Sequence, residues 1–269
     1  SGIAARRGRR NRRHISNQMT SLPVGFRTIP LAHRGLYDVE HGRPENSIPA
    51  IRAAIDSGYG IEIDVQLSAD NQAMVFHDYD LGRLTSHSGA VRQHRAADLG
   101  AMTLIGSSAT IPTLGQVLSV VAAQTPLLLE IKDQDGAMGP DTGDLERAIA
   151  DAVRRYGGPV AVMSFNTHSV ALMAEIAPQL PRGLTTGALA SEKWRLIPAA
   201  TRDRMRLIPD YDAVGASFIS HQITDLDRPR VDRKSTRLNS SHVVNSYAVS
   251  CLQKKTYTNT AEYTTLCSS

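Results

Sequence analysis

The sequence predicts an α/β fold, a TIM (β/α)8 barrel that lacks its last strand and helices. Short apolar runs alternate with amphipathic stretches through the middle of the chain, and about seven of these runs read as strands. Alternating strands and helices imply a parallel sheet, because parallel strands need long crossover connections. Seven is one strand short of a closed barrel of this type. A doubly wound open sheet is the alternative, but no glycine-rich phosphate loop follows the first strand.

The expected elements follow one another in a regular order. Strands are predicted at residues 29–33, 60–67, 73–76, 127–131, 160–165, 183–186 and 214–219. Helices are predicted at residues 47–57, 113–123, 144–156 and 170–176. The first helix has a candidate N-cap at Asn46 or Ser47 and a candidate C-terminal glycine, Gly58.

Length, charge and cysteine content limit the possible classes of protein. The 269 residues suffice for one barrel-sized domain, and the formal net charge of +4 is mild. No apolar run approaches the roughly 18 residues that span a membrane, so we expect no stable membrane insertion. Both cysteines, Cys251 and Cys267, lie near the C-terminus. The cysteine-free middle excludes a disulfide framework and a thiolate metal site there, and a cytoplasmic location is the default. The sequence predicts no particular oligomeric state.

The first 18 residues differ from the rest in charge. Their arginines are Arg6, Arg7, Arg9, Arg10, Arg12 and Arg13. We interpret residues 1–18 as a basic, disordered leader. Because the first methionine is Met19, translation of upstream sequence is a second interpretation. A basic run can also be a nucleic-acid arm, but we expect no nucleic-acid partner.

The C-terminal segment differs from the rest in another way. From Asp232 it reads DRKSTRLNSSH, then two valines, then NSYAVSCLQKK. This text resembles the translation of a common sequencing adapter, with the valines in the place of its index. Single-base changes account for Asn245, Ser250 and Gln253. We therefore interpret residues 231–269 as a non-native tail in the place of the last strand. A barrel without that strand has two exposed edges, so we expect low stability.

Glu62 and Asp64 are the most informative pair in the chain. They alternate with Ile61, Ile63 and Val65, so both carboxylates point to one face of a strand. Two such groups repel each other and lose hydration on burial. A hard divalent cation such as Mg²⁺ or Ca²⁺ removes that conflict, since both ions prefer oxygen ligands. A pair of solvated edge residues or salt-bridge partners is the structural alternative.

Glu130 and Lys132 repeat this pattern on a later strand. They follow the apolar run 127–129 and share one face. Active sites of α/β barrels form at the C-terminal ends of the strands. Glu130 is therefore a candidate third metal ligand, and Lys132 is a candidate phosphate contact. An ordinary internal ion pair is the alternative.

His33 and His77 stand at the ends of the first and third expected strands. A single histidine at a strand end is more often structural than catalytic. Two histidines beside carboxylate-bearing strands favour an acid/base pair, because histidine titrates near neutral pH and one can donate a proton while the other accepts one. Arg34 follows His33 and offers a planar guanidinium that suits phosphate oxygens.

Seven short motifs carry a family resemblance. In chain order they are His33-Arg34-Gly35, Pro44-Glu45-Asn46-Ser47, Glu62-Ile63-Asp64-Val65, Val75-Phe76-His77-Asp78, Leu84-Thr85, Ile111-Pro112-Thr113-Leu114 and Glu130-Ile131-Lys132. With this order and these separations, the chain resembles the glycerophosphodiester phosphodiesterases, most closely the compact bacterial enzymes. The resemblance is strongest from His33 to Lys132 and continues more weakly to about Ile219.

The resemblance implies a fold, a cofactor and a reaction. The fold is a truncated TIM barrel of the phosphatidylinositol-phosphodiesterase-like type over residues 19–230, with a small insertion at about residues 80–111. One divalent cation, Mg²⁺ or Ca²⁺, is implied, with Glu62, Asp64 and Glu130 as its ligands. The resemblance further implies His33 and His77 as the general acid/base pair and Arg34 and Lys132 as phosphate contacts. The implied reaction converts a small-molecule glycerophosphodiester to glycerol 3-phosphate and an alcohol.

Two other functions stay open. A phospholipase D-like phosphodiesterase acting on intact lipids shares the two-histidine, carboxylate–metal centre, but such enzymes tend to be secreted and disulfide-bonded. An inactive phosphate-binding fragment is the second alternative. The presence of both histidines and all three carboxylates argues against an ancestral loss of activity.

Overall fold

The computed structural model describes residues 20–190, 194, 197–222 and 225, together with the backbone of residues 241–244 and 247–251. The predicted basic leader, residues 1–18, and most of the predicted non-native tail, residues 231–269, lie outside the described residues. No helix in the described part of the chain is long and apolar enough to cross a membrane.

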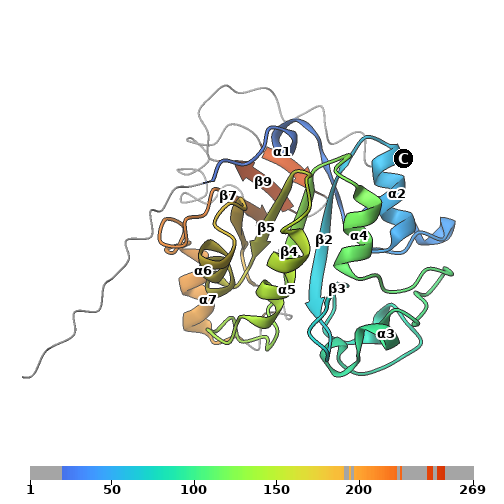
Figure 1. The fold of residues 1–269 in the computed structure, drawn as a ribbon. Coiled ribbons are helices and arrows are strands. Elements are labelled where there is room, and N and C mark those ends of the chain that lie inside the picture. The colour runs from blue at the N-terminus through green and yellow to red at the C-terminus, as the bar shows by residue number, and fades with distance from the viewer. Residues whose placement is uncertain are drawn as a thin grey trace, which may run out of the picture.

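The centre of the molecule is a sheet with helices packed along it (Figure 1). Its parallel strands are, in spatial order, β1 (Leu31–His33), β2 (Gly60–Leu67), β4 (Leu127–Ile131), β5 (Val160–Ser164), β6 (Arg182–Thr186) and β7 (Phe218–Gln222). The main helices are α2 (Ile48–Asp56), α4 (Leu114–Val121), α5 (Asp144–Val153), α6 (Thr167–Ile176) and α7 (Ala199–Arg206). This alternation confirms the predicted TIM-barrel-like fold, as an incomplete barrel within the described residues.

One expected barrel strand has a different role. Residues Ala73–Val75 form β3, which pairs antiparallel with β2 and lies off the path of parallel strands. The connection from β2 to β3 comprises only residues 68–72, whereas a parallel crossover needs about a dozen residues or more. The described residues therefore contain six parallel strands and not the seven expected. The last of them, β7, begins at Phe218 and not at residue 214, because Val214 and Gly215 belong to a turn in which Gly215 has φ +61°.

The free edge expected at the end of the sheet is covered. Strand β9 (Tyr247–Cys251) pairs antiparallel with β7, and β8 (Ser241–Val244) pairs antiparallel with β9. Figure 1 shows β9 beside β7. The expectation of an exposed edge at β7 is therefore wrong for this chain. The interpretation of residues 231–269 as non-native stays a prediction.

The start of α2 distinguishes the two candidate caps. Ser47 is the N-cap, and its hydroxyl accepts a hydrogen bond from the Ala50 N–H at 3.3 Å. Asn46 has a left-handed backbone conformation with φ +58°, and its side chain contacts β2 instead. Gly58 follows the helix with φ +75°, as the predicted C-terminal glycine requires.

The two faces of β2 and β4 bury different kinds of side chain. Odd-numbered apolar residues of both strands pack against the helices in the main hydrophobic cluster, with Ile149 of α5 among their neighbours. The even-numbered residues face the barrel interior, where Leu128 of β4 packs with Phe218 and with Phe26 of α1 (Gly25–Thr28). Glu62, Asp64 and Glu130 lie on this interior face. Glu62 is level with Leu128 in the strand register, and Asp64 and Glu130 lie one step nearer the C-terminal ends of the strands.

Residues 80–111 form a small unit with a core of its own. Short helices occupy Leu81–Arg83, Val91–Gln93 and Ala96–Leu99. Its buried apolar side chains belong to one cluster with β3: Met74, Phe76, Leu81, Val91, Leu99, Met102, Leu104 and Ile111. This unit is anchored at the end of β3, next to His77.

We expect Ile149→Ala to lower the free energy of unfolding by about 2–5 kcal/mol, because it leaves a cavity between α5 and the sheet. Ile149 is 0% exposed, whereas Ile105 is 54% exposed. The control Ile105→Ala is expected to change stability by no more than about 0.5 kcal/mol. Urea titrations followed by circular dichroism measure both values. Equal losses in the two variants would contradict this packing.

Candidate active site

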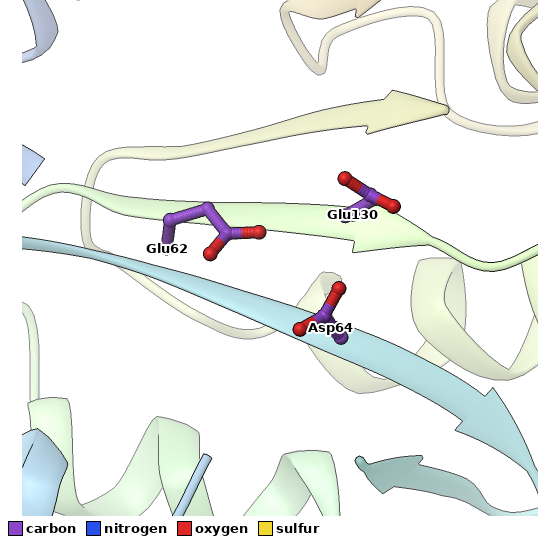
Figure 2. Close-up of side chains that lie close together, drawn as sticks. All are labelled: Glu62, Asp64 and Glu130. Carbon is purple, nitrogen blue, oxygen red and sulfur yellow. The ribbon is translucent and has the colours of Figure 1, made fainter. Parts of the chain in front are cut away.

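Three buried carboxylates meet at the interior face of the sheet. Glu62 and Asp64 come from β2, and Glu130 comes from β4, directly beside Asp64 in the strand register. Each contributes one oxygen atom, and these oxygens lie within 4.8 Å of one another. Figure 2 shows the three side chains on the two neighbouring strands. The structure thus brings together the three residues predicted as metal ligands.

The surroundings shift the pKa values of Glu62 and Asp64 in opposite directions. Burial and the charges of Asp64 and Glu130 raise the pKa of Glu62 well above its usual value. Burial would also raise the pKa of Asp64, but Lys132, His77 and Arg34 outweigh it and hold this pKa below the usual range. Asp64 is therefore ionised at neutral pH, whereas its surroundings disfavour the charged form of Glu62.

Lys132 lies against the triad. Its Nζ is 2.9 Å from Glu130 Oε1 and 3.4 Å from Asp64 Oδ1. Burial would lower the pKa of Lys132, but the charges of Glu130 and Asp64 raise it above its usual value. The ammonium group therefore stays charged and offsets part of the negative charge of the triad. The predicted phosphate contact therefore lies at the carboxylate triad.

Arg34 contacts the same cluster from the loop after β1. Its backbone N–H donates to Glu62 Oε2 at 3.0 Å, and its Nε lies 3.3 Å from Asp64 Oδ2. Its Nη1 donates to Glu45 Oε1 at 2.7 Å. The next residue, Gly35, has φ +78°, and a Cβ there would lie 2.9 Å from a backbone carbon of α2. A glycine at this position is needed for the turn against α2.

His33 lies close to Glu62, and His77 lies close enough to Asp64 to affect its pKa. His33 Nε2 is 4.0 Å from Glu62 Oε2. Burial and the adjacent Arg34 charge lower the pKa of His33 to about 4, so its imidazole is neutral at pH 7. His77 Nδ1 is 2.5 Å from Asp78 Oδ1. Burial would raise the pKa of Asp78, but hydrogen bonds from His77 and Arg83 hold it below the usual range. An ionised Asp78 fixes the proton of His77 on Nδ1 and leaves Nε2 for other contacts.

A network that the sequence did not predict links these two parts of the site. Arg83, from the unit 80–111, donates to both Glu45 oxygens at 2.9 and 2.7 Å. It also donates to both Asp78 oxygens at 2.5 and 3.0 Å. Glu45 therefore joins Arg34 to Arg83, and Asp78 joins Arg83 to His77. No local sequence signal marks Arg83, because it ends a short helix outside the motifs that carry the other site residues.

Asn46, one of the two candidate caps in the sequence, has a role at the site that sequence reasoning missed. Its amide nitrogen donates to Asp64 Oδ2 at 3.0 Å, and its Oδ1 accepts the Asp64 N–H at 3.2 Å. The positive φ of Asn46 directs the side chain to β2 instead of the helix end. An asparagine before a serine at a helix start is typical of an N-cap. The sequence therefore gave no indication that the Asn46 side chain contacts Asp64 instead.

Two glutamines fix the backbone beside His77. Gln66 Nε2 donates to the carbonyl oxygens of His77 and Asp78, both at 3.1 Å. Gln134 Nε2 donates to Gln66 Oε1, also at 3.1 Å. The end of β4 thereby supports the segment that carries the second histidine.

The sequence model of the Glycerophosphoryl diester phosphodiesterase family matches residues 33–240. This range includes every residue of the site described above. The chain belongs to this family. It is therefore an enzyme of the glycerophosphodiester phosphodiesterase class, a phosphoric diester hydrolase.

Individual relatives agree with this assignment. The glycerophosphodiester phosphodiesterase of Caldanaerobacter subterraneus is 30% identical over 181 residues, which are 64% of this chain and 72% of that protein. An uncharacterized protein of Bacillus subtilis is 30% identical over 175 residues, 62% of this chain and 70% of that protein. Among solved structures, an Oleispira antarctica phosphodiesterase in complex with the product sn-glycerol-3-phosphate superposes with a TM-score of 0.62. At 23% identity, covering 77% of this chain and 80% of that one, it supports the fold.

We expect Asp78→Asn to destabilise the protein at neutral pH by on the order of 1 kcal/mol, after allowance for solvent screening of this partly exposed group. The pKa of Asp78 is depressed in the folded state. Its contribution is therefore present above the unfolded pKa, about 4, and is lost as the pH falls through the folded value. Urea unfolding at pH 7 and pH 3 measures the free energy of unfolding, and the gap between Asp78→Asn and wild type should be smaller at pH 3. The exposed control Asp98→Asn should have the same free energy of unfolding as wild type at both pH values. A difference that widens at pH 3 would contradict the depressed pKa.

Proposed function

We propose that this chain hydrolyses small-molecule glycerophosphodiesters to glycerol 3-phosphate and an alcohol at the centre formed by Glu62, Asp64, Glu130, His33 and His77. The observation that carries this proposal is the buried carboxylate triad, whose oxygens lie within 4.8 Å of one another. Membership of the phosphodiesterase family supports the reaction. We further propose that residues 19–230 constitute the enzyme domain, with residues 80–111 as its insertion.

The triad fits one hard divalent cation, Mg²⁺ or Ca²⁺. All three donors are carboxylate oxygens, the ligands that both ions prefer. Burial, together with the charges of Asp64 and Glu130, raises the pKa of Glu62, and a divalent cation beside these carboxylates would favour their charged forms. A bound divalent cation supplies electrostatic stabilisation of negative charge on phosphoryl oxygens. Glu62, Asp64 and Glu130 would hold it.

The remaining residues act on the substrate directly. Arg34 and Lys132 keep their charges beside the triad and would orient the phosphodiester through its oxygens. One histidine accepts a proton from the attacking water as its oxygen bonds to phosphorus, and the other donates a proton to the alcohol oxygen as its bond to phosphorus breaks. Asp78 holds the Nδ1 proton of His77, so Nε2 is the atom of His77 that exchanges a proton.

The cysteine-free middle of the chain supports a cytoplasmic location.

We expect glycerol 3-phosphate release from glycerophosphocholine to stop when EDTA is added and to recover with Mg²⁺ or Ca²⁺, each tested alone. Glu130→Gln should raise the metal concentration needed for half-maximal activity, because it removes a charged ligand. The matched control Glu175→Gln changes an exposed glutamate and should not affect it. Turnover that is indifferent to EDTA would falsify the metal assignment.

We expect His77→Ala to lower kcat by about 10²–10⁴-fold, the usual contribution of a general acid or base. His87 lies in an exposed loop, so His87→Ala is the control and should retain activity. Stopped assays of glycerol 3-phosphate at pH 7 measure both variants. A His77→Ala variant with wild-type kcat would remove His77 from the mechanism.

Intact lipids distinguish the phospholipase D-like alternative. We expect release of choline from glycerophosphocholine but not from phosphatidylcholine vesicles under the same conditions. Faster release from phosphatidylcholine than from glycerophosphocholine would favour the alternative.

A further inference from the structure

A cavity of about 260 Å³ lies beside the proposed catalytic centre. It is lined by the end of β2, the loop after β4, the N-terminal turn of α5 and the start of α6. Lys132 lines this cavity and also contacts Glu130 and Asp64. The cavity is therefore next to the triad, on the face of the barrel where the strands end.

The lining of this cavity is strongly acidic. Its carboxylates are Asp133, Asp135, Asp141, Asp144 and Glu146, and its cations are Arg92 and Lys132. Lys132 is committed to the triad. Arg92 donates to the Ser68 carbonyl oxygen at 2.5 Å and lies 3.6 Å from Asp144. Within the described residues, no ion pair reaches the other carboxylates of the lining.

Local structure explains part of this acidity. Glu146 accepts the Gly143 N–H at 2.7 Å and so caps α5. Asp133 accepts from the Met138 N–H at 3.0 Å and from the Asn166 amide at 2.7 Å. These bonds hold the loop in place, but amide donors leave the carboxylate charges without a cation. Asp141 has no such structural role in the described part of the chain.

Ser169 provides an independent indication of a ligand. It lines the cavity from α6, and its side chain is 2% exposed. Its Oγ has no hydrogen-bond partner among the described residues. Buried hydroxyl groups are normally satisfied, so an unpartnered one at a cavity indicates that a bound molecule or water completes its bonding.

The spacing of the charges selects the kind of cation. Among the described residues, only Glu62, Asp64 and Glu130 bring three acidic ligand atoms within 4.8 Å of one another. A bare metal ion needs oxygens about 2.0–2.6 Å from its centre, so the dispersed carboxylates of the cavity do not suit one. A space of about 260 Å³ with charge spread around it suits a bulky organic cation.

We propose that this cavity binds the alcohol part of the substrate and selects glycerophosphodiesters whose alcohol carries an ammonium or trimethylammonium group. This inference rests on the proposed function, since it assigns a subsite to that reaction. The phosphate lies toward Lys132 and the triad, and the cationic group lies toward Asp135 and Asp141. Selection arises because an uncharged alcohol leaves the carboxylates without a counterion.

Binding of choline chloride tests the cavity without turnover. Saturation-transfer NMR on the full chain, with saturating Mg²⁺ to occupy the triad, compares choline with its uncharged isostere 3,3-dimethylbutan-1-ol. Wild type should bind choline and show little binding of the isostere. Asp135→Asn and Asp141→Asn change exposed residues and should each weaken choline binding about two- to fivefold. The control Asp56→Asn removes an exposed carboxylate at the end of α2 and should leave binding unchanged.

Turnover then separates this inference from the proposed function. Wild type should have a higher kcat/KM for glycerophosphocholine than for glycerophosphoglycerol. The Asp135 and Asp141 variants should lower kcat/KM for glycerophosphocholine and leave kcat/KM for glycerophosphoglycerol unchanged. The inference is overturned if choline and its isostere bind equally well, or if the variants lose kcat/KM equally for both substrates. In either case the protein still hydrolyses its substrates, so the proposed function stands. Choline binding with no hydrolysis of either substrate overturns the proposed function and leaves a cation site.

Discussion

The burial of three carboxylates in the interior of a sheet is the constraint on which the rest of the site depends. Glu62, Asp64 and Glu130 lie within 4.8 Å of one another and are at most 8% exposed. Desolvation of such charges costs about 5 kcal/mol per ion. The fold offsets this cost with Lys132 directly after β4, Arg34 after β1 and the raised pKa of Glu62. Each offset comes from a different segment, so the site ties those segments together.

This requirement explains the unusual backbone around the site. Arg34 and Asn46 both have positive φ values, 59° and 58°, which side chains other than glycine rarely adopt. In these conformations the Arg34 N–H reaches Glu62 and the Asn46 amide reaches Asp64. Strained conformations persist where surrounding contacts fix them, and they cluster at functional sites. Arg83 extends the same network, because its hydrogen bonds join the unit 80–111 to Glu45 and Asp78.

The sequence predicted the parts of this structure that depend on local patterns. Alternation within β2 correctly placed Glu62 and Asp64 on one face, and apolar runs located the barrel strands. The direction of strand pairing was harder to predict. Nothing within residues 73–75 indicates that β3 pairs antiparallel with β2, and only the short connection between the two strands does. Asn46 was a candidate cap, together with Ser47, because both residues precede a helix. Arg83 escaped notice because its partners, Glu45 and Asp78, are distant or in other motifs and meet it only in the folded chain.

The charge distribution also bears on what kind of substrate suits the whole site. At the triad, Lys132 and Arg34 only partly neutralise the carboxylates, so an anionic phosphodiester needs a further positive charge there. A few ångströms beyond Lys132 the cavity lining stays negative, and no described cation is free to neutralise it. A single added ion cannot satisfy both regions, because their carboxylates do not share one compact group. A substrate that is negative at its phosphate and positive at its alcohol matches both regions, which is why we favour a zwitterionic glycerophosphodiester over a neutral one.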